Sequence, residues 1–154
     1  MKSKTLYWED FTPGAIWGVA RSEPVDRMSI ITFAREFDPL DIHTDLELAN
    51  QTPLGIHCAS GIHTLAMAQR MLCDAVLSQS NIIVGGRIDN LIMISPVQHG
   101  DMLRLFVRAR DRKSHSRSAD RGWVSLSVCV SKNEALDVMT YETSVLMCKR
   151  AVGV

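Results

Sequence analysis

Stretches in which apolar and polar residues alternate dominate the second half of the chain. Between residues 102 and 112 the apolar positions are Leu103, Leu105, Val107 and Ala109, and Arg104, Arg108 and Arg110 lie on the opposite face. Residues 122–132 alternate in the same way, with valines and a leucine opposing serines and a cysteine. A period of two is typical of strands with one buried face. Together with two further apolar stretches, this pattern predicts four strands, over 82–95, 102–112, 122–132 and 136–149.

Turn-forming residues separate these four strands. The expected turns are 96–100, which contains Pro96 and Gly100, 114–122, and the pair Asn133-Glu134. Inside the first strand, Gly85-Gly86 interrupts the apolar run, which indicates a bulge or a close approach of another segment.

The first half of the chain changes to helical spacing. Residues 14–21 read as one strand. Ile30, Phe33, Ala34 and Phe37 then recur three and four positions apart, which predicts a helix over 27–37. Asp26 is its expected N-cap, and Pro39 is expected to end it. Residues 38–44 are expected to form a loop, followed by a short helical turn over 45–50.

The longest predicted helix covers residues 60–77. It is apolar almost all round, so it is expected to be buried on most sides, with a narrow polar stripe of His63, Arg70 and Asp74. One long buried helix, one earlier strand and an antiparallel meander predict an α+β fold in which an antiparallel sheet wraps around a long central helix, the hot-dog fold. A general α+β sandwich has the same order of elements.

Composition sets the class of protein. With 154 residues, 46% hydrophobic and 22% charged, the chain is expected to form one globular domain over 1–154. A formal net charge of zero argues against broad electrostatic binding to nucleic acid or to an anionic membrane. No apolar run resembles a signal peptide or approaches membrane-spanning length. The four cysteines form no CxxC pair, so we expect reduced thiols, a cytoplasmic location and no metal site.

Residues 38–45 concentrate groups that move protons. Asp38, Asp41 and Asp45 surround His43 just past the end of the predicted helix. A carboxylate beside an imidazole can hold the ring in one tautomer and activate a water molecule. The alternative is that Asp41 or Asp45 caps the next short helix and that His43 is a surface residue.

A run of small residues, Ala59-Ser60-Gly61, leads directly into the long helix. The free backbone N–H groups at a helix start can bind an oxyanion, and small side chains let a ligand approach them. Ser60 is equally well placed to be the N-cap, and Gly61 to permit close packing. The two interpretations are compatible, because a capped terminus still has spare donors.

Three strings resemble the MaoC-like dehydratase family, which includes the (R)-specific enoyl-CoA hydratases. They are FAREFDPLDIHTD, TPLGIHCASGIHTLAMAQRM and GGRIDNLIMISPVQHGDMLRLFVRARDRKSHSRSADRGWVSL. The resemblance extends over about residues 8–150. It implies a hot-dog fold, a homodimer or higher homo-oligomer, and the addition of water to trans-2-enoyl thioesters of coenzyme A, or its removal. No cofactor is implied, because the substrate itself carries coenzyme A.

The resemblance also implies roles for particular residues. Asp38 and His43 match the family's catalytic pair, which stands five residues apart, and Ala59-Ser60-Gly61 matches its small-residue turn. The thioester carbonyl is expected to bind N–H groups near Ser60, Gly61 and Ile62, and Gly55, His57 and His63 are candidates to line the pocket. Two departures concern the substrate: Asp38-Pro39-Leu40-Asp41-Ile42-His43 lacks the asparagine of the Asp-x-Asn-Pro-x-His form, and Ile56 replaces a common glycine.

Two questions stay open at the level of sequence. The basic residues of 108–121 either contact the phosphates of coenzyme A or form a solvated hairpin, since Asp111 and Asp120 dilute their charge. An acyl-CoA thioesterase and a non-catalytic acyl-CoA-binding protein are the alternatives to the hydratase on the same fold.

Overall fold

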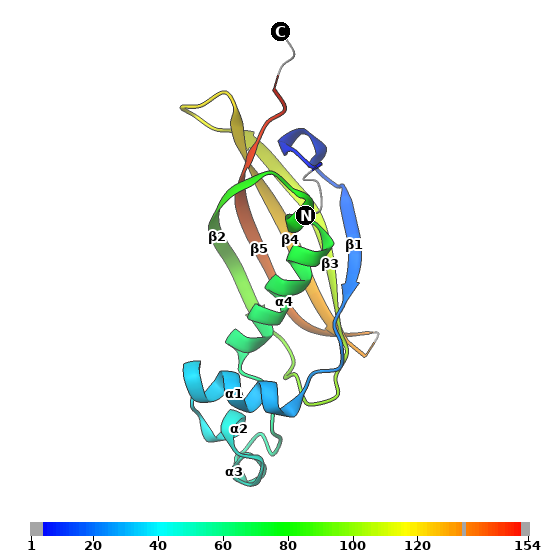
Figure 1. The fold of residues 1–154 in the computed structure, drawn as a ribbon. Coiled ribbons are helices and arrows are strands. Elements are labelled where there is room, and N and C mark those ends of the chain that lie inside the picture. The colour runs from blue at the N-terminus through cyan, green and yellow to red at the C-terminus, as the bar shows by residue number, and fades with distance from the viewer. Residues whose placement is uncertain (1–4, 134, 152–154) are drawn as a thin grey trace.

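A computed structural model describes residues 5–133 and 135–151. A single five-stranded antiparallel sheet wraps around one long helix, and three short helices gather at one end (Figure 1). In chain order the elements are η1 (Trp8–Asp10), β1 (Ile16–Arg21), α1 (Arg27–Phe37), α2 (Asp41–Thr44), α3 (Leu46–Gln51), α4 (Gly61–Ala75), η2 (Leu77–Gln79), β2 (Ile82–Met93), β3 (Leu103–Ser114), β4 (Arg121–Lys132) and β5 (Leu136–Cys148). The predicted α+β hot-dog architecture is confirmed.

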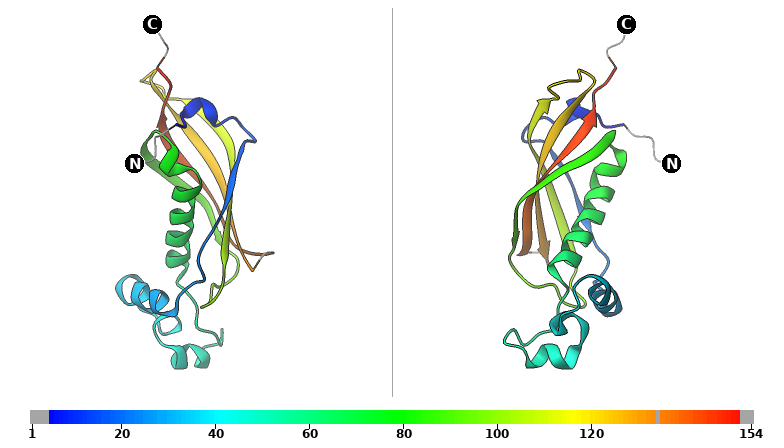
Figure 2. Two further views of the ribbon diagram at one scale, coloured as in Figure 1. Left: turned by 45° about the vertical axis from the view of Figure 1, so that its right-hand side comes forward. Right: turned by 90° about the vertical axis from the view of Figure 1, so that its left-hand side faces the viewer.

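The sheet has the strand order β1-β3-β4-β5-β2, and α4 lies against its concave face (Figure 2). The alternating apolar residues of β3 and β4 are buried against the helix, including Leu105, Val107, Leu126 and Val128. The serines and arginines between them face outward, as the period of two predicted. This packing fixes α4 along the sheet and so determines where the start of α4 lies.

The N-terminal helices follow the predicted caps but contain one element that was not predicted. Asp26 caps α1 by accepting a hydrogen bond from Ser29 N at 2.8 Å, and α1 ends at Phe37, two residues before Pro39. The loop expected over 38–44 is wrong in part, because residues 41–44 form α2. A helix of one turn is too short to show a period in its sequence, which is why the pattern missed it.

The expectation that the long helix is buried on most sides is also wrong for the single chain. The helix is shorter than predicted, Gly61–Ala75, and the 3-10 turn η2 follows it. Only one face is buried, through His63, Thr64, Ala68, Met71 and Leu72. On another face the side chain of Ile62 is 51% exposed. The helix is therefore apolar on faces that its own chain leaves exposed.

Strand β2 is an edge strand with an unusually apolar exposed surface. Ile88 is 51% and Ile92 56% exposed, and further exposed apolar residues of this edge are Ile83, Val84, Met93 and Ile94. Its pairing with β5 shifts register three times, once between Gly85 and Arg87, where the paired glycines predicted a bulge. A side chain at Gly86 would overlap the Trp123 ring, so glycine is required there for this close approach.

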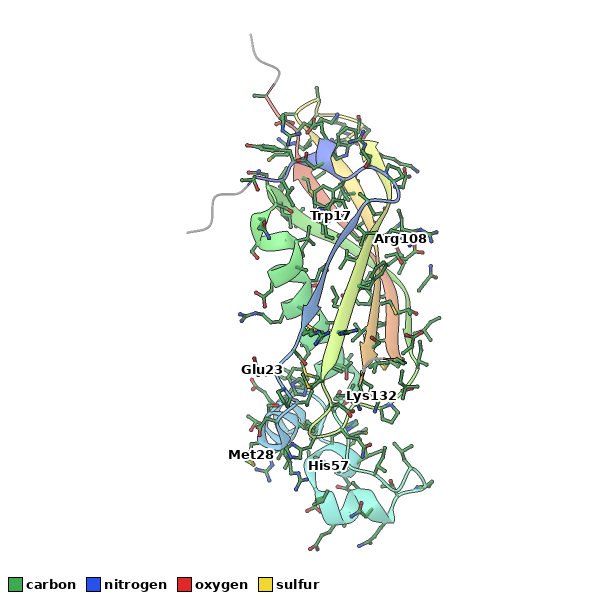
Figure 3. The ribbon with its side chains drawn as sticks, turned by 90° about the vertical axis from the view of Figure 1, so that its right-hand side faces the viewer. Trp17, Glu23, Met28, His57, Arg108 and Lys132 are labelled. Carbon is green, nitrogen blue, oxygen red and sulfur yellow. The ribbon has the colours of Figure 1, made fainter. Side chains whose placement is uncertain are left out.

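The turn between β2 and β3 is held by a buried ion pair. Lys132 Nζ donates to Asp101 Oδ2 at 2.9 Å and to the Pro96 carbonyl at 2.6 Å, and both side chains are about nine-tenths buried. Figure 3 shows Lys132 at the end of the sheet nearest the short helices. From the same turn, the Val97 carbonyl accepts a hydrogen bond from Ala59 N at 2.7 Å. The ion pair therefore ties the sheet to the segment that leads into α4.

Candidate functional site

The residues singled out in the sequence meet where three helix ends converge. Asp38 is the C-cap of α1, His43 belongs to α2, and Ser60 is the N-cap of α4. These helix ends lie below the sheet in Figure 1, next to the start of α4. The cap positions expose backbone and side-chain polar groups that the helices themselves do not satisfy, so the convergence gathers donors and acceptors in one place.

Ser60 connects the carboxylate of Asp38 to the helix start. Its hydroxyl donates to Asp38 Oδ2 at 2.5 Å and accepts a hydrogen bond from Ile62 N at 3.2 Å. Ser60 is fully buried, so this arrangement is rigid and shielded from solvent on that side. The hydrogen bond fixes the Asp38 carboxyl group beside the first turn of α4.

The imidazole of His43 faces the same carboxylate. Its Nδ1 lies 2.8 Å from the Cys58 carbonyl oxygen, and its Nε2 lies 3.7 Å from Asp38 Oδ2. A carbonyl only accepts hydrogen bonds, so we assign the proton of the neutral ring to Nδ1. Nε2 is then an unprotonated acceptor that points toward Asp38. Two acceptors at this separation are suited to hold the two hydrogens of one water molecule.

The start of α4 offers a free backbone donor next to this pair. The Ile62 N–H is already taken by Ser60, whereas the Gly61 N–H has no acceptor among the described residues. A cavity of about 220 Å³ opens beside it. Its lining consists of Ala59, Gly61, Thr64, Met93, Ile94, Ser95, Pro96, Val97, Val138 and Met139. Of the three positions expected to bind the thioester oxygen, Ser60, Gly61 and Ile62, the N–H of Ile62 is therefore occupied and that of Gly61 is available at the cavity.

The other pocket candidates lie outside this cavity. Gly55 has φ +66° in an exposed turn, which explains why a glycine is present. His57 bonds to the His43 carbonyl through Nε2 at 2.9 Å and lines a separate cavity of about 160 Å³ (Figure 3). His63 is buried, with its ring stacked on Phe33 at 4.5 Å between centroids. Within the described residues, His57 therefore supports the backbone of α2 rather than facing Gly61.

The basic hairpin lies far from Asp38 and His43 within one chain. Figure 1 shows the β3–β4 turn at the opposite end of the sheet from α1, α2 and α3. Strand β3 has 12 residues, which at a rise of about 3.3 Å per residue corresponds to roughly 40 Å. Its charges are partly paired, for example Arg121 with Asp120 at 2.9 Å. A larger cavity of about 440 Å³ near Trp123 also belongs to this distant half of the sheet.

No metal site or membrane span emerges from the residues the structure describes. Within 5–133 and 135–151, no group of three or more histidine, cysteine or acidic side chains is placed to share a metal ion. None of the helices in these ranges is both long and apolar enough to cross a membrane.

Sequence patterns missed two contributors to the site. The Cys58 carbonyl fixes the tautomer of His43, and the Met93 side chain lies over Gly61. A backbone carbonyl has no residue signature, and Met93 is 32 positions from Gly61, so no motif joins them. Both become apparent only when β2 and the segment before α4 are seen together.

His63 gives the fold a pH dependence that can be measured. Burial lowers the pKa of His63 below its ordinary value of 6.5, because the charged ring loses hydration. The unfolded chain therefore binds a proton near pH 6.5 that the folded chain does not, and stability is expected to fall as the pH decreases through that value. His63→Phe preserves an aromatic stack on Phe33 and removes this titration. Urea unfolding should show that the free energy of unfolding falls less between pH 7.5 and 5.5 in the variant than in the wild-type chain. An equal fall in both chains would contradict the role of His63 in this pH dependence.

Comparison with known proteins identifies similar sequences and folds. The family model described as "MaoC like domain" matches residues 11–128, which include Asp38, His43 and Gly61. The uncharacterized protein YdeM of Bacillus subtilis (strain 168) is 28% identical over 139 residues, covering 90% of this chain and 96% of YdeM. A MaoC-like dehydratase from Rhodospirillum rubrum superposes with a TM-score of 0.87 at 28% identity, covering 96% of this chain and all of that chain.

A more distant structure shares the fold alone. The R-hydratase PhaJ1 from Pseudomonas aeruginosa superposes with a TM-score of 0.68 at 15% identity, over 96% of this chain and 92% of that chain. The family match extends over more than half of the chain and contains the whole convergence of helix ends. The chain belongs to the family of MaoC-like domains.

Proposed function

We propose that the chain is a hydro-lyase that adds water to 2-enoyl-CoA thioesters, or removes it from 3-hydroxyacyl-CoA thioesters. The observation that carries the proposal is that Asp38 Oδ2 and His43 Nε2 face each other at the N-cap Ser60, one residue before the free Gly61 N–H, which itself lines a cavity of about 220 Å³. The MaoC-like family and its dehydratase member at 28% identity support a reaction of this class.

The catalytic pair acts on one water molecule. The water donates one hydrogen to His43 Nε2 and the other to Asp38, which leaves an oxygen lone pair directed at C3 of the enoyl group. As the C3–O bond forms, one O–H bond of the water breaks and the proton passes to His43. The resulting imidazolium lies 3.7 Å from the Asp38 carboxylate, which stabilises its charge. The proton required at C2 then comes from this pair, which restores both groups.

The Gly61 N–H supports this step from the other end of the conjugated system. Addition at C3 moves negative charge onto the thioester oxygen, and a preorganised backbone donor stabilises that charge more in the transition state than in the ground state. The position of Gly61 at the start of α4 adds the favourable field of the helix N-terminus.

A second copy of the chain is the occupant that best suits the β2 edge. An exposed edge strand with isoleucines at 51% and 56% exposure presents both unpaired backbone groups and apolar surface. Pairing β2 with β2 of a partner in a two-fold homodimer covers both. Sedimentation equilibrium should give a mass of twice 17.2 kDa or a higher multiple; a monomer at micromolar concentration would contradict this arrangement.

A cytoplasmic location is part of the proposal. Cys58, Cys73, Cys129 and Cys148 are free thiols in the structure. Unpaired cysteines are compatible with a reducing compartment, where disulfides are rare.

The direct experiment is an activity screen of the purified protein against straight-chain and branched trans-2-enoyl-CoA thioesters. Hydration removes the conjugated double bond, so its ultraviolet absorbance should fall while the thioester stays intact. Release of free coenzyme A thiol would instead indicate the thioesterase, because that reaction breaks the C–S bond. Binding of acyl-CoA without turnover of any thioester in the panel would indicate a binding protein and overturn the hydratase.

A further inference from the structure

We propose that Met93 is the residue that limits acyl-group size, and that the substrate's acyl group is an uncharged hydrocarbon. This inference rests on the proposed function, because it assigns the cavity beside Gly61 to the acyl group. The cavity measures about 220 Å³, and none of its lining residues carries a charged side chain. An ionised acyl group would lose its hydration there without gaining a partner.

Met93 lies directly on the donor that the thioester requires. A β-carbon placed on Gly61 would overlap Met93 Sδ and lie 2.5 Å from Met93 Cε. The thioether end therefore occupies the space above the first residue of α4. A thioester that bonds to the Gly61 N–H must pass beside this side chain, so Met93 contacts the part of the acyl group nearest the reacting carbons.

Met93 also differs from the opposite wall in how it is packed within the chain. Val97, Val138 and Met139 are each only 1% exposed and are fixed by the core, whereas Met93 lies at the end of an edge strand and is 53% exposed in the single chain, before the proposed homodimer forms. Methionine is unbranched and adapts its shape easily. The buried wall sets a constant boundary, and the position of the Met93 side chain sets how much space remains.

The hydroxyl groups of the lining carry no charge. The Thr64 hydroxyl donates its hydrogen to the Ser60 carbonyl at 3.2 Å, and Ser95 is neutral, so the lining offers an ionised acyl group no opposite charge. Met93→Ala removes three heavy atoms from the wall of this cavity and should therefore admit a longer acyl group.

The test measures binding of saturated acyl-CoAs, which have no double bond to hydrate, by isothermal titration calorimetry. Butanoyl-CoA and decanoyl-CoA are compared on the wild-type chain, Met93→Ala and Met93→Phe, so that the contribution of coenzyme A cancels in the ratio of the two Kd values. Met93→Ala should shift the ratio toward decanoyl-CoA by about tenfold, the usual scale for pocket contacts of this size. Met93→Phe should shift it toward butanoyl-CoA. Met102→Ala is the matched control, because Met102 is 46% exposed and lies outside the cavity lining.

Each outcome decides between the two proposals. A ratio that is unchanged in both Met93 variants, or that shifts equally in Met102→Ala, overturns the role of Met93 even if the wild-type chain hydrates enoyl-CoA. Succinyl-CoA binding as tightly as butanoyl-CoA overturns the uncharged acyl group. The expected shifts in a chain that hydrates no enoyl-CoA support the acyl cavity and overturn the hydratase. A wild-type chain that binds none of these thioesters overturns both.

Discussion

Asp38→Asn and His43→Ala are each expected to lower kcat/KM for enoyl-CoA hydration by about 10²–10⁴-fold, the usual contribution of a positioned acid–base group. Asparagine retains an acceptor oxygen for the Ser60 hydroxyl but loses the charge that stabilises the imidazolium. Alanine at position 43 removes the imidazole whose Nδ1 bonds to the Cys58 carbonyl and whose Nε2 accepts the proton. Because both groups act on one water molecule, the double variant should be hardly slower than the slower single variant.

Asp41→Asn is the matched control for this prediction. Asp41 belongs to the same short segment and is exposed, but makes no contact with Ser60 or His43 side chains among the described residues. Its replacement should leave kcat/KM within about twofold. A loss in Asp41→Asn as large as that in Asp38→Asn would mean that the segment, rather than the Asp38–His43 pair, is what the substitutions disturb.

Lys132→Met is expected to destabilise the fold by about 3–5 kcal/mol, because removing one partner of a buried ion pair leaves the other charge without compensation. Asp101 is 9% exposed, and the loss of Lys132 also leaves the Pro96 carbonyl without its donor. The cost should appear in urea unfolding at neutral pH as a lower midpoint with an unchanged slope.

Two further variants separate the ion pair from the loss of a lysine in general. Lys113→Met removes a lysine whose side chain is 80% exposed and should change stability by less than about 1 kcal/mol. Lys132→Met combined with Asp101→Asn should recover part of the loss, since no uncompensated charge remains. An equal loss in Lys132→Met with and without Asp101→Asn would show that packing of the lysine stem, not its charge, holds the turn.

Periodicity along the chain predicted the elements well where one side of an element faces the core. The strands β3 and β4 were found from alternating residues, and the start of α1 from the spacing of Ile30 and Phe33 together with the cap Asp26. The same reasoning located α4 and β2, but its prediction that α4 is buried on most sides is wrong, and apolar residues of both elements remain exposed in the single chain. Apolar spacing in a sequence indicates that one face of an element is removed from water. It does not indicate whether the same chain or a second copy covers that face.

The sequence predicted only those parts of the site whose reactive residues lie close together in the chain. Asp38 and His43 are five residues apart, so their residue types alone suggested a pair. The Ser60–Asp38 hydrogen bond joins residues 22 positions apart, and the Val97 carbonyl that holds Ala59 comes from the turn between β2 and β3. Such contacts depend on how α1, α4 and the sheet pack, which no local spacing determines.

The central claim is that one water molecule between Asp38 and His43 reacts with a thioester held by the Gly61 N–H. The most direct test is a crystal structure of the Asp38→Asn variant with a bound trans-2-enoyl-CoA. It should place the thioester oxygen within about 3 Å of Gly61 N and C3 next to His43 Nε2, with the acyl group against Met93. A thioester bound elsewhere on the chain, with C3 out of reach of His43, would contradict it.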